Sequence, residues 1–87
     1  MTRDEVYELI RTHLSEELGI DLGRIDEGTR FKEDLEADSL DLYELVMELE
    51  DTYGVRISDE DATRILTVGQ AVDFVVAHEP AGRESRP

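Results

Sequence analysis

The sequence predicts a small all-α domain, a four-helix bundle of three main helices and one short helix, with a long ordered loop between the first two. Two observations carry this prediction. Apolar residues recur every three or four positions in separate stretches, which is the spacing of one helix face. A residue suited to capping a helix N-terminus precedes each stretch. The chain has 87 residues, which is enough for one domain around one small core.

The composition limits the class of protein. Charged residues make up 37% of the chain, and the formal net charge is −14. Such a surface repels the phosphate backbone of nucleic acids and attracts basic proteins. The absence of cysteine excludes a disulfide framework and a thiolate metal site. No apolar run could span a membrane and the first residues lack the apolar segment of a signal peptide, so we expect a cytoplasmic protein.

The first helix is predicted at Arg3–Leu18. Thr2 and Glu5 have the spacing of a capping box, in which each side chain accepts a hydrogen bond from the other residue's backbone amide. Gly19 follows the last periodic residue and is a suitable helix terminator. The apolar face of this helix is formed by Val6, Leu9, Ile10, His13, Leu14 and Leu18.

The segment Ile20–Leu35 is predicted to be a loop. It is longer than the usual connection in a helix bundle, which has about 2–8 residues. Loops of this length are generally ordered by their own apolar residues or have a function. We therefore expect Leu22, Ile25, Phe31 and Leu35 to anchor this loop in the core.

The second helix is predicted to begin after Asp38, an N-cap residue, and to end at Gly54. At about 100° per residue, its apolar residues fall on two nearly opposite faces. One is the core stripe, which we expect to be buried, formed by Leu42, Leu45, Val46, Leu49 and Tyr53. The other, which we call the second face and expect to be exposed, is formed by Leu40, Tyr43 and Met47.

Acidic side chains border the second face. The stretch from residue 33 to 55 has no basic residue and nine acidic ones: Glu33, Asp34, Glu36, Asp38, Asp41, Glu44, Glu48, Glu50 and Asp51. An apolar strip surrounded by one sign of charge predicts a docking surface for partners with basic patches. The alternative is that a small domain leaves some apolar side chains exposed, or that the long loop covers them.

Two further helices complete the predicted bundle. Ser58 with Asp61 caps a short helix through about Ile65, and Thr67 with Gln70 caps the last helix. The apolar residues of the last helix fit the helical period better than that of a strand: Val68, Ala71, Val72, Val75 and Val76. Residues 79–87 are polar and contain both prolines, so we expect a domain over 1–78 and a disordered tail over 79–87.

Ser39 is placed where the long loop enters the second helix. The N-terminus of a helix carries a partial positive charge and unpaired amides, so a phosphate attached to this serine would be favoured there. The local sequence Asp38-Ser39-Leu40 is not specific by itself, because the same residues are common as ordinary helix caps. The position is therefore compatible with a phosphodiester, and also with simple capping.

A wider stretch around Ser39 resembles a known family. The run from Phe31 to Asp41, FKEDLEADSLD, followed by ELVMELE from Glu44 to Glu50, is similar to the acyl carrier proteins of bacterial fatty acid synthesis. The resemblance extends over about Val6–Val76. It implies a carrier, not an enzyme, with no catalytic residue of its own. It also implies that Ser39, between Asp38 and Leu40, is the attachment site of 4′-phosphopantetheine, a cofactor derived from coenzyme A.

The resemblance also implies partners for the chain. A holo-carrier synthase would modify Ser39, and enzymes of fatty acid biosynthesis would receive acyl thioesters from a monomeric carrier. Family positions for partner contacts fall on Leu40, Asp41, Tyr43, Glu44, Met47, Glu50 and Asp51, and Glu48 lies on the same acidic border. Glu36 departs from the family, which usually has glycine there. Glycine tolerates backbone angles that glutamate resists, so the loop is expected to enter the second helix differently.

The sequence also leaves alternative functions to consider. A carrier of a polyketide or another specialised acyl pathway would share the fold and the chemistry of Ser39. An acidic interaction module without a cofactor is the alternative from another class. A hydrolase is disfavoured, because there is no G-x-S-x-G motif and His13 lies on an apolar helix face. No dedicated metal site is expected, because Asp59, Glu60 and Asp61 point in different directions on a helix and lack the spacing of a calcium-binding loop.

Overall fold

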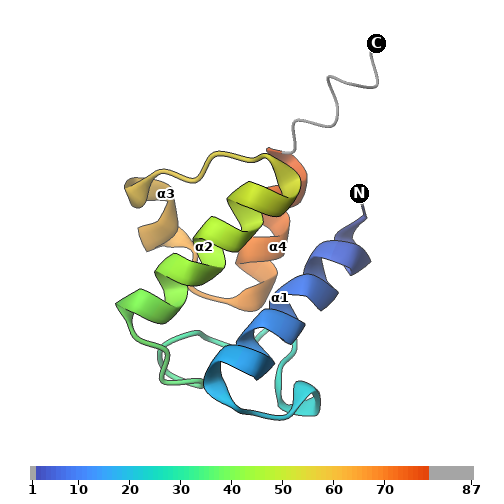
Figure 1. The fold of residues 1–87 in the computed structure, drawn as a ribbon, viewed down its shortest axis with the longest axis vertical. Helices are drawn as coiled ribbons and strands as arrows, with labels where there is room; N and C mark the ends of the chain where they lie inside the picture. Colours follow the sequence, from blue (N-terminus) through green and yellow to red (C-terminus); the bar gives the residue numbers. More distant parts are fainter. Residues whose placement is uncertain (1, 79–87) are drawn as a thin grey trace.

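The computed structural model describes residues 2–78. The elements are helix α1 (Arg3–Leu18), the 3₁₀ turn η1 (Leu22–Arg24), and helices α2 (Ser39–Tyr53), α3 (Asp59–Arg64) and α4 (Val68–Ala77). Three longer helices pack together and the short α3 lies at their side (Figure 1). The predicted four-helix fold is confirmed. None of these helices has the length and apolar content that crossing a membrane requires.

The helix ends follow the predicted capping. Thr2 with Glu5 and Thr67 with Gln70 form reciprocal capping boxes. Asp38 caps α2 and forms a further box with Asp41 that the sequence analysis did not predict. Gly19 and Gly54 end α1 and α2 in the left-handed conformation, with φ of 69° and 70°. Such a φ suits glycine, which has no Cβ to clash. Because these signals are local, they fix both ends of α1 and α2 correctly.

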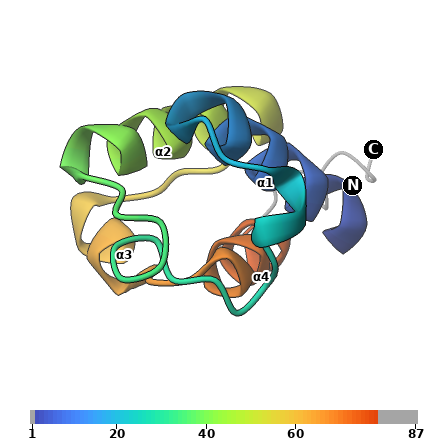
Figure 2. The ribbon, with the colours of Figure 1, turned by 90° about the horizontal axis from the view of Figure 1, so that it is seen from below.

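The core lies where α1, α4 and the long loop meet. The α1 and α4 helices make the most extensive contact in the molecule, whereas α1 touches α2 much less. Figure 2 shows the helices arranged in a ring in the order α1, α2, α3 and α4. The largest fully buried side chains come from three of these helices and from the loop: Val6, Ile10, Leu14, Ile25, Phe31, Leu49, Val68, Val72 and Val75.

The long loop is fastened to the start of α4 by its backbone. The amide of Phe31 donates to Leu66 O at 3.1 Å, and the amide of Val68 donates to Thr29 O at 3.0 Å. The amide of Gly69 donates to Glu27 O at 2.8 Å. A Cβ at position 69 would lie only 2.9 Å from that oxygen, so only glycine allows this close approach.

Two arginines of α1 also hold the loop. The guanidinium of Arg11 donates to Ile25 O at 3.0 Å and to Leu22 O at 2.8 Å. Arg3 makes ion pairs with Glu27 of the loop and with Asp73 of α4. Arg11 thus adds a second donor to each carbonyl, because Leu22 O also accepts from the amide of Ile25 and Ile25 O also accepts from the hydroxyl of Tyr7.

One predicted loop anchor is wrong. Leu22 is 43% exposed, whereas Ile25 and Phe31 are buried as expected and Leu35 is half-buried. Leu22 lies in η1, which is held through its backbone carbonyl by Arg11. The segment therefore needs no side-chain anchor at this residue. The expected tail, residues 79–87, lies outside the described residues.

Candidate functional site

Ser39 is the first residue of α2, and it is exposed. Asp38 Oδ1 accepts from the amide of Asp41 at 3.0 Å, and Asp41 Oδ2 accepts from the amide of Asp38 at 3.1 Å. The amides of Ser39 and Leu40 have no acceptor within residues 2–78. Two free amides at the positive end of a helix fit an anionic group attached to the Ser39 hydroxyl. The neighbouring carboxylates are meanwhile held in the capping box.

The loop before Ser39 is closed tightly. The amide of Glu36 donates to Lys32 O and the amide of Ala37 donates to Phe31 O, both at 3.0 Å. Phe31 and Ala37 are 2% and 5% exposed, so buried residues fix the chain just before the serine. Glu36 lies between them with a left-handed φ of 56°. Glu36 thus adopts a backbone angle that glycine tolerates and glutamate resists, and the expectation that the loop enters α2 differently stays a prediction.

A hollow of about 550 Å³ opens beside Ser39. Ser39 itself belongs to its lining. The remaining lining is largely apolar and comes from α2, from α3 and the residues on either side of it, from the start of α4 and from the loop. Its apolar members include Phe31, Leu42, Leu45, Val46, Leu49, Ile57, Ala62, Ile65, Leu66 and Ala71. A group attached to Ser39 therefore has an apolar space next to it.

The core stripe of α2 is only partly buried as predicted, and the hollow accounts for two of the three residues that differ. Leu45 and Leu49 are buried as predicted, but Leu42, Val46 and Tyr53 are only half-buried. Leu42 and Val46 line the hollow, so one side of each faces empty space instead of packed atoms. A helical wheel separates the core-facing side of a helix from its solvent-facing side. It does not show whether the space on the core-facing side is filled by other side chains.

The second face is exposed as predicted. Leu40, Tyr43 and Met47 are 62%, 58% and 46% exposed. Of the acids expected around it, Glu48 and Asp51 are exposed, whereas Asp41, Glu44 and Glu50 are half-buried. Exposed Leu66, which the sequence analysis did not single out, adds a further apolar side chain at the border of the hollow.

One of the acids expected to contact partners also has an internal contact. Glu50 Oε2 accepts a hydrogen bond from the amide of Ile57 at 2.9 Å. This bond ties the C-terminal half of α2 to the connection that leads to α3. Glu50 therefore helps to position the wall of the hollow.

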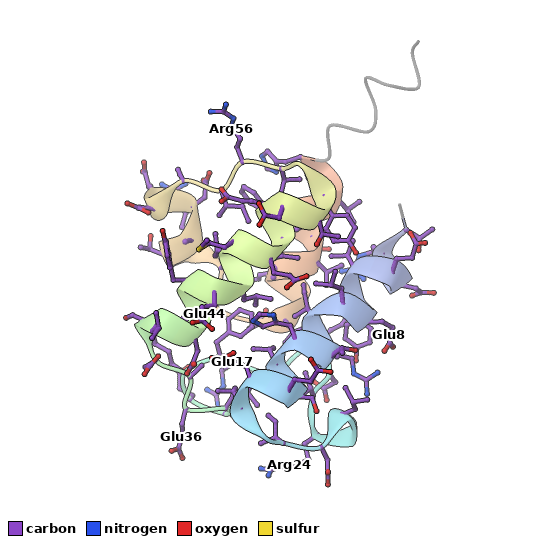
Figure 3. The ribbon with its side chains drawn as sticks, in the orientation of Figure 1. Glu8, Glu17, Arg24, Glu36, Glu44 and Arg56 are labelled. Carbon is purple, nitrogen blue, oxygen red and sulfur yellow. The ribbon has the colours of Figure 1, made fainter. Side chains whose placement is uncertain are left out.

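Glu17 belongs to the acidic border but was missed from the sequence. It lies near the end of α1, beside Glu44 of α2 (Figure 3). It also interacts with Asp41 of α2. The pKa of the Glu17 carboxyl is raised to about 6, first because its acid form shares a hydrogen bond with Glu44, then through desolvation and Asp41. No local pattern in α1 signals this, because the carboxylates that face Glu17 are more than twenty positions away in the sequence.

The residues that a hydrolase or a metal site would use do not form such a site among the described residues. His13 is largely buried on the apolar side of α1, and its Nδ1 lies 3.6 Å from Glu48 Oε1. In the described part of the chain, no group of three or more His, Asp or Glu side chains could hold a metal ion. Asp59, Glu60 and Asp61 form the first turn of α3, where the helix dipole favours negative charge.

Comparisons with known proteins show the family of this chain. A family model described as the phosphopantetheine attachment site matches residues 8–75. The chain is 48% identical over 81 residues to the acyl carrier protein of Rubrobacter xylanophilus, covering 93% of this chain and 100% of that protein. It is 44% identical over 79 residues to the acyl carrier protein of Lactobacillus johnsonii, covering 91% and 99%. A solved acyl carrier protein structure from Enterococcus faecalis matches with a TM-score of 0.80 and 43% identity, over 91% of this chain and 100% of that chain.

Proposed function

The chain belongs to the acyl carrier proteins of the phosphopantetheine-attachment family, and we propose that Ser39 is the residue that carries its 4′-phosphopantetheine arm in fatty acid biosynthesis. It is a carrier, not an enzyme, and its cofactor is 4′-phosphopantetheine. When bound, this group supplies a terminal thiol that holds an acyl chain as a thioester. The observation that carries the assignment is the exposed Ser39 hydroxyl at the N-terminus of α2, beside two free amides and an apolar hollow.

In the proposed attachment step, Ser39 Oγ attacks the phosphorus that joins pantetheine to the rest of coenzyme A. The new bond is Oγ–P, and the broken bond is the P–O bond of the diphosphate. The nucleotide bisphosphate leaves, and the hydroxyl proton passes to a base of the synthase. The contribution of this chain is positional. Asp38 and Asp41 fix the first turn of α2, and the amides of Ser39 and Leu40 remain available to the phosphate oxygens.

We propose that the hollow beside Ser39 shelters the acyl chain. Leu42 and Val46 from α2 and Ile65 after α3 present apolar surface around an empty space. Covering an acyl chain there removes apolar area from water, which is favourable by roughly 25 cal/mol per Å². The same burial keeps the acyl chain away from water until a partner enzyme draws it out.

The docking role of the second face is also a proposal. Leu40, Tyr43 and Met47 form an exposed apolar strip, and acidic side chains lie on both sides of it. Partners would therefore present an apolar patch surrounded by arginine and lysine. Charge would set the rate of encounter and its salt dependence, and the apolar contacts would set the rate of dissociation.

We further propose that the carrier domain spans residues 1–78 and acts as a cytoplasmic monomer. The family match ends at residue 75, three positions before the end of this span. A net charge of −14 opposes association between copies of the chain.

The attachment site is tested by intact mass spectrometry. The chain is incubated with coenzyme A and a holo-carrier synthase. We expect the wild type to gain one phosphopantetheine mass and Ser39→Ala to gain none. Ser58→Ala is the matched control, because Ser58 is also a serine at the start of a helix, and it should be modified like the wild type. Modification that persists in Ser39→Ala would end the assignment.

A further inference from the structure

Glu36 has an unusual backbone conformation. Within residues 2–78 it is the only residue other than glycine with a positive φ, at 56°. In that region the Cβ of an ordinary residue approaches the following carbonyl oxygen, which costs free energy. Strained residues of this kind are concentrated at functional sites, where another interaction retains them.

The loop explains the conformation but not the residue type. The two backbone bonds made by the amides of Glu36 and Ala37 close the turn, and this closure requires a left-handed residue between Lys32 and Asp38. Glycine or asparagine would satisfy the same geometry at a lower cost. The turn therefore does not explain why this position holds glutamate, which is strained at this backbone angle.

The contacts of the Glu36 side chain within residues 2–78 do not explain why glutamate is present. It is exposed, and within residues 2–78 its carboxylate has no hydrogen bond or ion pair. Figure 3 shows it pointing away from the body of the molecule, beside the start of α2. Other carboxylates near the attachment site do have partners, such as Asp34 with Arg30 and Asp38 with the amide of Asp41.

We propose that Glu36 is a recognition residue for the enzyme that modifies Ser39, and that its carboxylate contacts a basic side chain of that enzyme. This inference rests on the proposed attachment at Ser39. Glu36 lies on the loop side of the serine, and the acids of α2 lie on its helix side. An enzyme that covers the chain on both sides of the Ser39 hydroxyl would contact Glu36 as well as the acids of α2. Charge complementarity then selects a basic partner for this flank, as it does for α2.

The test separates charge from strain with three variants. Glu36→Gln removes the charge and keeps the strain, and Glu36→Gly removes both. Glu36→Asp keeps the charge. Asp4→Asn is the matched control, because it removes one exposed carboxylate at the first turn of α1, near the opposite end of the molecule. The rate of phosphopantetheine transfer is measured by intact mass at low and at high salt, together with the melting temperature of each unmodified variant.

We expect Glu36→Gln and Glu36→Gly to lower kcat/KM about three- to fivefold at low salt, through KM and not kcat, which is the size of one surface ion pair. The difference should vanish at high salt, and Glu36→Asp should react like the wild type. Glu36→Gly should also melt at a higher temperature than the wild type, whereas Glu36→Gln should not.

Several results would overturn the inference. Transfer to Glu36→Gln at the wild-type rate would show that the carboxylate is not recognised. An equal loss in Asp4→Asn would show that only total charge matters. No gain in melting temperature for Glu36→Gly would remove the strain on which the inference depends. In each of these cases the wild type is still modified at Ser39, so the proposed function stands. A wild type that gains no mass would refute both.

Discussion

The two sides of this small domain are stabilised in different ways. On the side of α1, α4 and the loop, buried side chains from Val6, Leu14 and Val72 are fully covered, and the ion pairs and hydrogen bonds of Arg3 and Arg11 hold the segments together. On the side of α2 and α3, the helices make few contacts, a hollow separates them, and apolar side chains remain exposed. That side is mostly acidic: residues 39–66 contain eight acidic residues and two arginines, Arg56 and Arg64.

We infer from this difference that one side of the molecule provides most of the stability and that the other side is available for the proposed function. A small domain has little stability to spare, because it buries a modest share of its surface. Here α1 and α4 supply most of the packing. The α2 and α3 helices can then keep an open apolar space and a mostly acidic surface. Binding regions are generally drawn from the less stable parts of a protein.

The largest expected effect comes from truncating apolar residues on the two sides. Leu14→Ala should lower the free energy of unfolding by roughly 2–5 kcal/mol, because it leaves a cavity in the packed core. Leu42→Ala should cost about 1 kcal/mol, since this side chain already borders an empty space. Met47→Ala, on the exposed second face, should stay within about 0.5 kcal/mol. Urea unfolding measures all three, and equal losses would contradict the division into two sides.

A smaller effect is expected from Arg11. Arg11→Gln should lower the free energy of unfolding by about 1 kcal/mol, because the carbonyls of Leu22 and Ile25 each lose one of two donors. Arg64→Gln is the matched control, since Arg64 makes only an exposed pair with Glu60 and should cost no more than about 0.5 kcal/mol. If the two variants unfold at the same urea concentration, Arg11 does not hold the loop.

Much of this fold is readable from the sequence, because its signals are local. Thr2 with Glu5 and Gly19 define α1, and Asp38 and Gly54 define α2. The exposure of Leu40, Tyr43 and Met47 also follows from helical periodicity alone. The family resemblance adds the chemistry that the local sequence around Ser39 leaves open.

What the sequence does not predict depends on contacts between distant segments. Leu22 is exposed because Arg11 of another element holds its backbone. Leu42 and Val46 are half-buried because α3 stands away from α2 and leaves the hollow. Glu17 joins the acidic border only when α1 and α2 pack together. None of these features has a period or a motif that could have revealed it.

The smallest expected effect concerns the acidic side and pH. The pKa of Glu17 is raised to about 6 in the folded protein from an ordinary value of 4.5, so the folded state binds this proton more readily than the unfolded state. Stability should therefore rise as pH falls from 7 through 6 toward 4.5. The depressed pKa of Asp34, which is paired with Arg30, acts in the opposite direction, but only as pH falls below its ordinary value of 3.8.

Glu17→Gln should raise the melting temperature at pH 7.5 and reduce the gain observed on acidification to pH 5.5. Glu16→Gln is the matched control, because Glu16 is an exposed neighbour on the same helix. This substitution should change neither the melting temperature at pH 7.5 nor its gain on acidification. Melting curves at the two pH values decide the matter. An unchanged pH dependence in Glu17→Gln would mean that the cluster with Glu44 and Asp41 does not strain the fold.

The central claim, that the side of α2 and α3 is left open to receive an acyl chain from Ser39, is tested most directly by hydrogen–deuterium exchange. The holo protein with a free thiol is compared with the same protein carrying an octanoyl thioester. We predict slower amide exchange in α2 and α3 of the octanoyl form, with α1 unchanged, because the acyl chain fills the hollow that α2 and α3 line and that α1 does not reach. Slowing confined to α1 and α4, or no change in α2 and α3, would contradict the account.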